Sequence, residues 1–225
     1  MEAKSAASDI IFILDSSGSM SKMGDEVLQS VNQFITEQKA LFGDDGTKFT
    51  FYTFNNVHVV VYDGLLSEME PVTKYDPNGM TALYNVIETA INAKNVGGPK
   101  HDVICAILTD GEDNCSTITG SDINSLVTNM KSLYGWKFIY LGANQDAFKV
   151  GSSIGITRCC NFAPTMDGIH SAGIVLSRAI SAQRSGYDDQ AAGIVEMTST
   201  GDVLPLVVVD FDPIEPTAAP KLTRS

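Results

Sequence analysis

The segment DIIFILDSSGSM (residues 9–20) changes abruptly from apolar to polar after Leu14. An apolar run without alternation, here residues 10–14, is typical of a strand buried on both faces of a parallel sheet. Oxygen-bearing side chains follow it at once at Asp15, Ser17 and Ser19. Clustered oxygens at a strand end suit a hard cation such as Mg²⁺. The alternative interpretation is a polar turn that caps a helix, since Ser and Asp are good capping residues.

The chain beyond this strand alternates between helical and extended patterns. A helix is predicted over 22–41, with Met23, Val27, Val31, Phe34, Ile35 and Leu41 on its buried face. Strands 48–54 and 57–62 flank an Asn-Asn turn and should pair antiparallel. The remaining expected elements are a helix 82–94, a strand 103–109, a helix capped by Ser121 with Ile123, Leu126, Val127, Met130 and Leu133 inward, a strand 136–141, a short helix 145–150 interrupted by Gly151, a strand 159–162 and a helix 166–184.

This order predicts an α/β fold of the Rossmann-like, doubly wound kind. We expect a six-stranded, mostly parallel sheet with one antiparallel strand and helices on both faces. The strand 103–109 is also continuously apolar and ends at Asp110, so it should be central and adjacent to the first strand. Ligands of such sheets bind beyond the carboxyl ends of the strands where the strand order reverses. Asp15 and Asp110 should therefore share one acidic crevice.

Composition limits the domain organisation and the partners. The chain has 225 residues with 44% hydrophobic content, enough for one sizeable core. We expect an N-terminal extension at 1–8, one domain at 9–185, and a tail at 186–225 that is partly docked and Pro-rich at its end. Acidic residues number 27 and basic ones 15, a net charge of −12, which disfavours nucleic acid and anionic membranes as partners.

The N-terminal residues and the cysteines bear on location. Residues 1–8 contain no apolar stretch of the kind a signal peptide needs, and no membrane span is predicted. The four cysteines form no CxxC pair: Cys105 should be buried, and the adjacent Cys159 and Cys160 should point to opposite faces of a strand. We expect a reduced, cytoplasmic protein.

Three spaced motifs together resemble the von Willebrand factor A domain family. They are Asp15-x-Ser17-x-Ser19, the loop Gly-Met-Thr-Ala-Leu that contains Thr81, and Leu-Thr-Asp-Gly-Glu, which contains Asp110. The resemblance covers residues 8–185. It implies that these five residues form a metal-ion-dependent adhesion site (MIDAS) for Mg²⁺, with Mn²⁺ or Ca²⁺ as alternative ions. It also implies that the three hydroxyls bind the ion directly and that the carboxylates act largely through water.

The resemblance implies a non-enzymatic binding module within a protein assembly. Neutral hydroxyls leave much of the ion's charge unquenched, so an Asp or Glu of a partner protein would complete its coordination. Gly18 should let the backbone pass close to the ion. Glu112 and Asp113 are expected to be solvated charges at the rim.

Two alternatives remain open from the sequence. A Mg²⁺ site could serve a phosphohydrolase. However, Ser17 stands where aspartyl phosphotransferases need a second Asp, no phosphate-binding Gly loop is present, and neither acidic loop contains a His. The metal could instead be purely structural and closed by the chain's own tail, in which Asp210 and Asp212 flank Phe211. The apolar segment LPLVVVDF (204–211) is more simply read as an edge strand or clasp on the domain.

Overall fold

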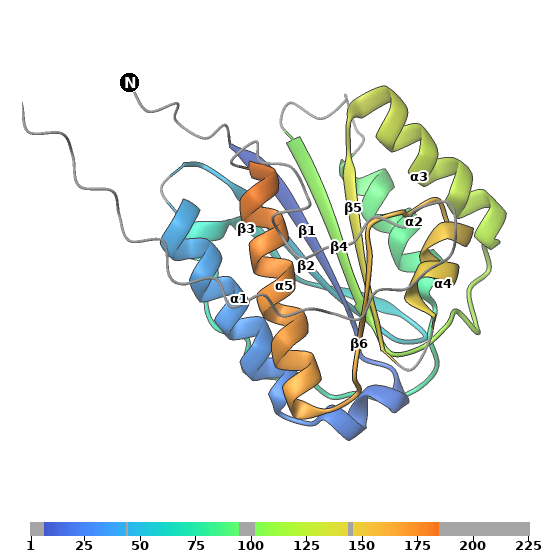
Figure 1. Ribbon diagram of the computed structural model, residues 1–225, viewed down its shortest axis with the longest axis horizontal. Coiled ribbons are helices and arrows are strands. Elements are labelled where there is room, and N and C mark those ends of the chain that lie inside the picture. Colours follow the sequence, from blue (N-terminus) through green and yellow to red (C-terminus); the bar gives the residue numbers. More distant parts are fainter. Residues whose placement is uncertain (1–6, 44, 95–101, 144–145, 185–225) are drawn as a thin grey trace, which may run out of the picture.

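A computed structural model describes residues 7–43, 45–94, 102–143 and 146–184 (Figure 1). Its elements are β1 (Ser8–Asp15), the 3-10 helix η1 (Gly18–Met23), α1 (Glu26–Phe42), β2 (Lys48–Phe54), β3 (His58–Leu65), the 3-10 helix η2 (Leu66–Glu68), α2 (Leu83–Lys94), β4 (Asp102–Thr109), α3 (Gly120–Tyr134), β5 (Lys137–Ala143), α4 (Ala147–Ser153), β6 (Cys159–Phe162) and α5 (Met166–Arg184). The predicted tail at 186–225, including 204–211, lies outside the described residues.

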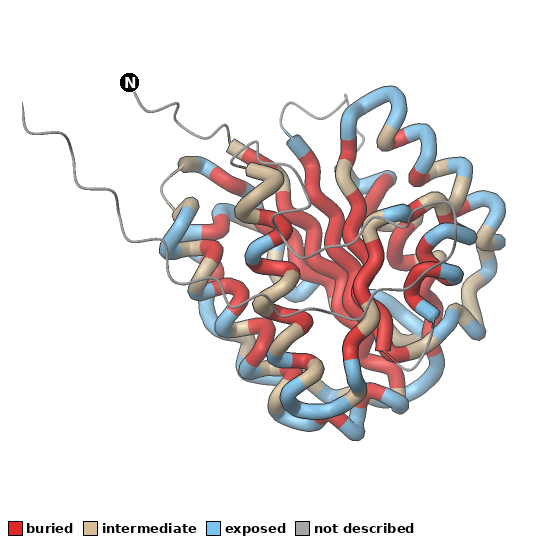
Figure 2. Tube along the Cα trace, in the orientation of Figure 1, coloured by how far each residue is buried: buried red, intermediate tan, exposed pale blue. Residues whose placement is uncertain are grey.

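The predicted sheet is confirmed. Its strand order is β3-β2-β1-β4-β5-β6, and β3 is the strand that pairs antiparallel, with β2. The apolar residues of β1 are almost completely buried, because β1 is central and both of its faces are covered (Figure 2). The chain winds from β1 outward to β2 and β3, then returns to β4 on the other side. The strand order therefore reverses between β1 and β4, and Asp15 and Thr109 end these two strands at the same edge.

Helices cover both faces of the sheet, as predicted. On one face α1 and α5 pack over Phe12, Phe49 and Phe51, and on the other α2, α3 and α4 pack over Ile11, Ile13 and neighbouring strands. Cys160 belongs to the first core and Cys159 to the second, so the two thiols do point to opposite faces. All four cysteines are free, and Cys105 is buried.

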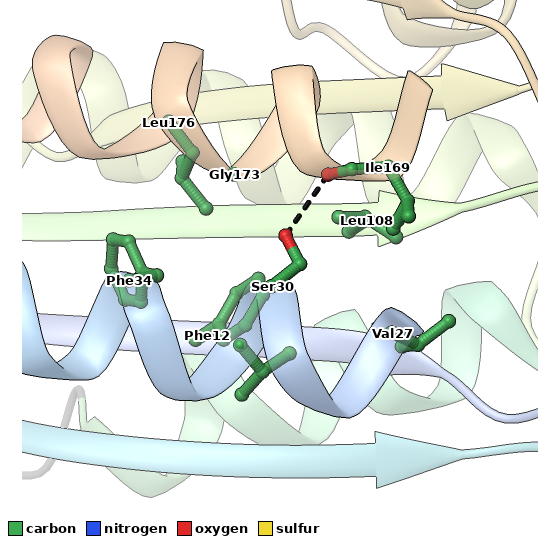
Figure 3. A pocket seen from close by; sticks show the side chains of 9 residues that line it. Phe12, Val27, Ser30, Phe34, Leu108, Ile169, Gly173 and Leu176 are labelled. Carbon is green, nitrogen blue, oxygen red and sulfur yellow. Dashed lines mark hydrogen bonds between the residues drawn. The ribbon is translucent and has the colours of Figure 1, made fainter. Parts of the chain in front are cut away.

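Helices α1 and α5 lie parallel, and polar groups join them along their length. Figure 3 shows the Ser30 hydroxyl donating to the Ile169 carbonyl at 2.9 Å, beside a small cavity of about 10 Å³. Further along the same two helices, the side-chain amide of Gln38 in α1 donates to the Ser177 hydroxyl in α5 at 3.0 Å. Gly173 faces Ser30 so closely that a Cβ at this position would overlap its hydroxyl. Glycine is therefore favoured where the helices meet.

Several helix boundaries were predicted wrongly. The first helix is divided: η1 ends at Met23 and α1 begins at Glu26. Leu41 is 60% exposed, because Phe42 makes the inward contact in the last turn of α1. The Cζ atom of Arg184 lies 3.7 Å from the centroid of the Phe42 ring. The 3-10 helix after β1 matters for the site, because it allows the polar loop to turn before α1 starts.

The ends of α3 and the path of α4 also differ from the prediction. Thr119, not Ser121, caps α3, because Thr119 and Asp122 exchange hydrogen bonds as a capping box. Leu133 is 70% exposed, since Gly135 turns the chain back in a left-handed conformation and Trp136 fills the core. Helix α4 continues through Gly151, where a Cβ would overlap the thiol of Cys159. This glycine permits close packing and does not interrupt the helix.

Candidate metal centre

The loop that follows β1 places three oxygen-bearing side chains together. Asp15 and Ser17 are buried, while Ser19 is exposed. The Ser17 amide donates to Oδ1 of Asp15 at 2.6 Å, and the hydroxyls of Ser17 and Ser19 lie 3.1 Å apart. The carboxylate thus holds the turn that presents the two hydroxyls, which is why a DxSxS spacing folds locally in this way.

The loop after β4 meets the first loop through Asp110. Oδ1 of this buried carboxylate accepts a 2.6 Å hydrogen bond from the Ser19 hydroxyl. The predicted convergence of Asp15 and Asp110 is therefore confirmed. It depends on β1 and β4 being neighbours, since the two loops are far apart in sequence.

Thr81 comes from a third loop, between η2 and α2, and is buried. Its hydroxyl oxygen lies 3.4 Å from the position a Cβ would take at Gly111, and that of Ser19 lies 3.9 Å from the same position. Both hydroxyls therefore face the start of the Asp110 loop. The five predicted side chains are brought to one place at the carboxyl ends of the central strands.

Backbone hydrogen bonds hold the Thr81 loop between its neighbours. The Gly18 amide donates to the Gly79 carbonyl at 3.0 Å, and the Asn78 amide donates to the Ser16 carbonyl at 2.8 Å. On the other side, the Asn114 side chain accepts from the Thr81 amide at 2.9 Å. The position of Thr81 is thus set by both acidic loops. Gly18 approaches the Gly79 backbone, and its predicted passage close to the ion stays a prediction.

Two supporting residues were not found from the sequence. The Thr109 hydroxyl donates to Oδ2 of Asp15 at 2.6 Å, so hydrogen bonds orient both oxygens of this carboxylate. The Tyr75 hydroxyl donates to the Asp15 carbonyl at 2.6 Å. The place of Thr109 beside Asp110 at a strand end was a usable signal. Nothing in the local pattern pointed to Tyr75, whose contact exists only through the fold.

The rim residues have different roles. Glu112 is exposed, as expected. Asp113 is not simply a solvated charge, because its carboxylate accepts from the Tyr84 amide at 3.2 Å and from the Ser116 hydroxyl. Asp113 and Ser116 together satisfy the first amides of α2, which fixes the helix that follows Thr81.

The two carboxylates of the cluster are buried, and burial raises the pKa of both. Burial raises the pKa of Asp15 to about 6, although hydrogen bonds from Thr109 and Ser17 lower it, and the charge of Asp110 raises it further. Burial likewise raises the pKa of Asp110, against the effects of Ser19 and Lys22. Within the described ranges neither carboxylate forms an ion pair, although the charge of Lys22 partly offsets that of Asp110.

The donor set fits a small hard cation. It combines two carboxylates with three hydroxyls, all oxygen ligands of the kind that Mg²⁺ prefers. No group of three or more His, Cys, Asp or Glu side chains that could hold a metal occurs in the described part of the chain.

Comparison with known proteins settles the family. The family model of the von Willebrand factor type A domain matches residues 9–158 of this sequence. The chain belongs to the von Willebrand factor type A (vWA) domain family. Members of this family are typically adhesion or protein-binding modules and are usually not catalytic. None of the curated proteins matches this vWA chain in sequence.

Solved structures show the same fold at low sequence identity. A von Willebrand factor type A protein from Catenulispora acidiphila is 16% identical with a TM-score of 0.57, over 77% of this chain and 42% of that one. Proximal thread matrix protein 1 from the mussel byssus, with a zinc-occupied MIDAS motif, is 16% identical with a TM-score of 0.55, over 79% and 49%. The pilus adhesin SpaC from Lactobacillus rhamnosus GG, in an open conformation, is 14% identical with a TM-score of 0.62, over 81% and 31%. This vWA chain spans less than half the length of each of the three.

In its described part, no helix has the length and apolar character needed to cross a membrane.

Proposed function

We propose that this vWA domain binds a protein partner through a divalent cation, Mg²⁺, held by Asp15, Ser17, Ser19, Thr81 and Asp110. The observation that carries the proposal is the pair of carboxylates, both less than a tenth exposed, that share one hydroxyl cluster and have no ion-pair partner in the described chain. Buried carboxylates are costly unless a cation compensates them. When bound, the cation would supply a positive charge with a coordination position open to an outside anion.

The chain's own residues would prepare that position. Thr109 and the Ser17 amide fix the Asp15 carboxylate, and Asp110 orients the Ser19 hydroxyl. The hydroxyls of Ser17, Ser19 and Thr81 are neutral, so they would leave the ion attractive to a carboxylate. A partner Asp or Glu is the group that best fits such a site. The metal in the motif of the mussel protein supports this assignment by family likeness.

Calorimetric titration of Mg²⁺ and Mn²⁺ into the metal-free protein tests the ion. Wild type should bind one ion, and Asp15→Asn should lose most of the affinity. Glu112→Gln is the matched control, because Glu112 is exposed and lies two residues from Asp110 but outside the cluster. Equal affinity in wild type and Asp15→Asn would contradict the metal site.

Partner binding needs a separate experiment. Proteins retained from a host extract by the immobilised domain in Mg²⁺ should be released by EDTA and absent from a Thr81→Ala column. Titrating the purified partner then measures affinity for both proteins with Mg²⁺ and with EDTA. The same affinity in all four conditions would show that the partner surface lies elsewhere and that the metal, if bound, is structural.

A further inference from the structure

Strand β3 (His58–Leu65) leaves one side of the sheet open. It is the terminal strand of the sheet order, and no described residue pairs with its outer edge. The opposite edge is different: β6 (Cys159–Phe162) has 4 residues, three of them buried, whereas β3 has 8, none of them buried. Proteins usually protect a long edge strand with charges, proline or a covering segment, because its unpaired backbone groups recruit other strands.

The side chains around this edge are apolar and exposed. Val57 is 65% exposed, Val59 54% and Val60 50%. Val59 lies opposite Thr53 and Val60 opposite Tyr52, so successive valines stand on the two faces of the sheet. An exposed valine on each face, together with an open backbone edge, suits an added β-strand better than a helix, which would cover one face only.

A groove continues the apolar surface beside the strand. Its volume is about 340 Å³, and its lining combines the apolar Val61, Tyr62, Met69 and Val72 with the charged Glu68, Glu70 and Lys74. Tyr62 and Val72 pack against the core that α1 and α5 cover. Apolar side chains of an added strand would therefore find apolar partners on this face, beside a charged rim.

The side chain of the last described residue reaches the loop before β2, which is bonded to the residue after β3. The guanidinium of Arg184, the last residue of α5, contacts Asp45 and the hydroxyl of Thr47. The Thr47 carbonyl accepts a 2.9 Å hydrogen bond from the amide of Leu66, the residue that directly follows β3. The Arg184 side chain thus reaches the open end of the β2–β3 hairpin, where Lys48 pairs with Leu65.

The sequence beyond Arg184 contains a segment of suitable chemistry. Residues 204–211 read LPLVVVDF and are rich in β-branched and apolar residues. Pro205 and Pro213 lie on the two sides of residues 206–211, and proline is tolerated at the first residue of an edge strand but ends a ladder. Residues 185–203 could span about 60 Å when extended, well over the roughly 27 Å length of β3.

We propose that residues 206–211 pair with the outer edge of β3 as a seventh strand of the sheet. Main-chain hydrogen bonds to β3 would hold the segment, and its valines would cover Val59 and Val60 on the two faces. The proposal is independent of the metal site, which lies at the carboxyl ends of β1 and β4.

Hydrogen exchange of the full-length protein tests this pairing through the amides of residues 57–65. Wild type is compared with Val207→Asp/Val209→Asp, which places charges on the proposed strand. Ala218→Asp/Ala219→Asp is the matched control, since it adds the same charges to the tail outside the segment. The amides of β1 serve as the internal reference for folding, and each protein is measured at two concentrations.

The proposal expects slow exchange over 57–65 in wild type and control, at both concentrations. In the Val207→Asp/Val209→Asp protein these amides should exchange at least about tenfold faster, with β1 unchanged. A synthetic peptide of residues 204–212, added in excess to this variant, should restore protection. Equal rates in all three proteins would overturn the proposal. Protection that rises with concentration, together with a doubled mass in light scattering, would assign the edge to a second copy and also overturn it.

Discussion

The Thr109 hydroxyl donates a 2.6 Å hydrogen bond to Oδ2 of Asp15, so the last residue of β4 orients the carboxylate that ends β1. The bond crosses between the two strands at the point where the sheet order reverses. Thr109 also accepts from the Gly111 amide at 3.1 Å, which ties the same side chain to the Asp110 loop. One buried hydroxyl therefore links both carboxylate loops without being a candidate ligand.

Thr109→Val should weaken metal binding while preserving side-chain shape. The substitution leaves Oδ2 of Asp15 without its donor, and loss of such supporting partners typically costs about 10–100-fold in metal affinity. Thr109→Ser keeps the hydroxyl and should retain most of the affinity. Calorimetry with Mn²⁺ distinguishes the two variants. Equal Mn²⁺ affinity in the Val and Ser proteins would show that the hydrogen bond from Thr109 to Asp15 does not support metal binding.

Asp15→Asn should stabilise the metal-free protein at neutral pH. The pKa of Asp15 is raised from 3.8 to about 6 in the folded state, so folding favours its protonated form. The stability that this form contributes is complete below about pH 4 and is lost as pH rises through 6. The change corresponds to about 3 kcal/mol at most.

Urea unfolding in EDTA across this range measures the effect of Asp15. Between pH 4 and 7 the wild-type free energy of unfolding should fall relative to that of Asp15→Asn. Saturating Mg²⁺ should restore wild-type stability at pH 7 but not alter the variant. Parallel pH profiles for the two proteins would contradict the assigned role of Asp15 burial.

Gly173→Ala should destabilise the fold by about 1–3 kcal/mol, as overpacking usually does. The new methyl group would overlap the Ser30 hydroxyl, which donates to the Ile169 carbonyl. Ser30→Ala removes the obstructing oxygen at the cost of one hydrogen bond. In the double variant the two effects should not add, because the clash is gone. Thermal unfolding of all four proteins gives the coupling energy, and simple additivity would refute the proposed contact.

Gly79→Ala should lower the metal affinity of the site in addition to the stability that its left-handed backbone costs. Gly79 has φ 77°, and a Cβ there would overlap the side chain of Asn56, so the Thr81 loop must shift. Gly135→Ala is the control: its φ is 69°, but nothing lies within 4 Å of the added carbon. Both should lose about 1 kcal/mol of stability from the left-handed conformation. Only Gly79→Ala should also lose Mn²⁺ affinity, which calorimetry can measure.

The sequence alone determined the sheet and the candidate ligands. Unbroken apolar runs at 10–14 and 103–109 identified two central strands, because a strand covered on both faces has no polar side. The topology rule for alternating strands and helices then placed Asp15 and Asp110 together at the carboxyl ends of the two central strands. These inferences succeed because they depend on periodicity and chain order, which are properties of the sequence.

The tertiary structure decided what surrounds those ligands. Leu41 and Leu133 fit their helical stripes, yet each is exposed, because a neighbouring residue, Phe42 or Trp136, makes the inward contact at the helix end. The hydrogen bond from Tyr75 to the Asp15 carbonyl has no local signal in the sequence, and the bond from Thr109 to the Asp15 carboxylate forms only because β1 and β4 are neighbours. Such contacts form only when separate strands and loops are packed together, so the raised pKa of Asp15 and the fixed place of Thr81 belong to the fold and not to the motif.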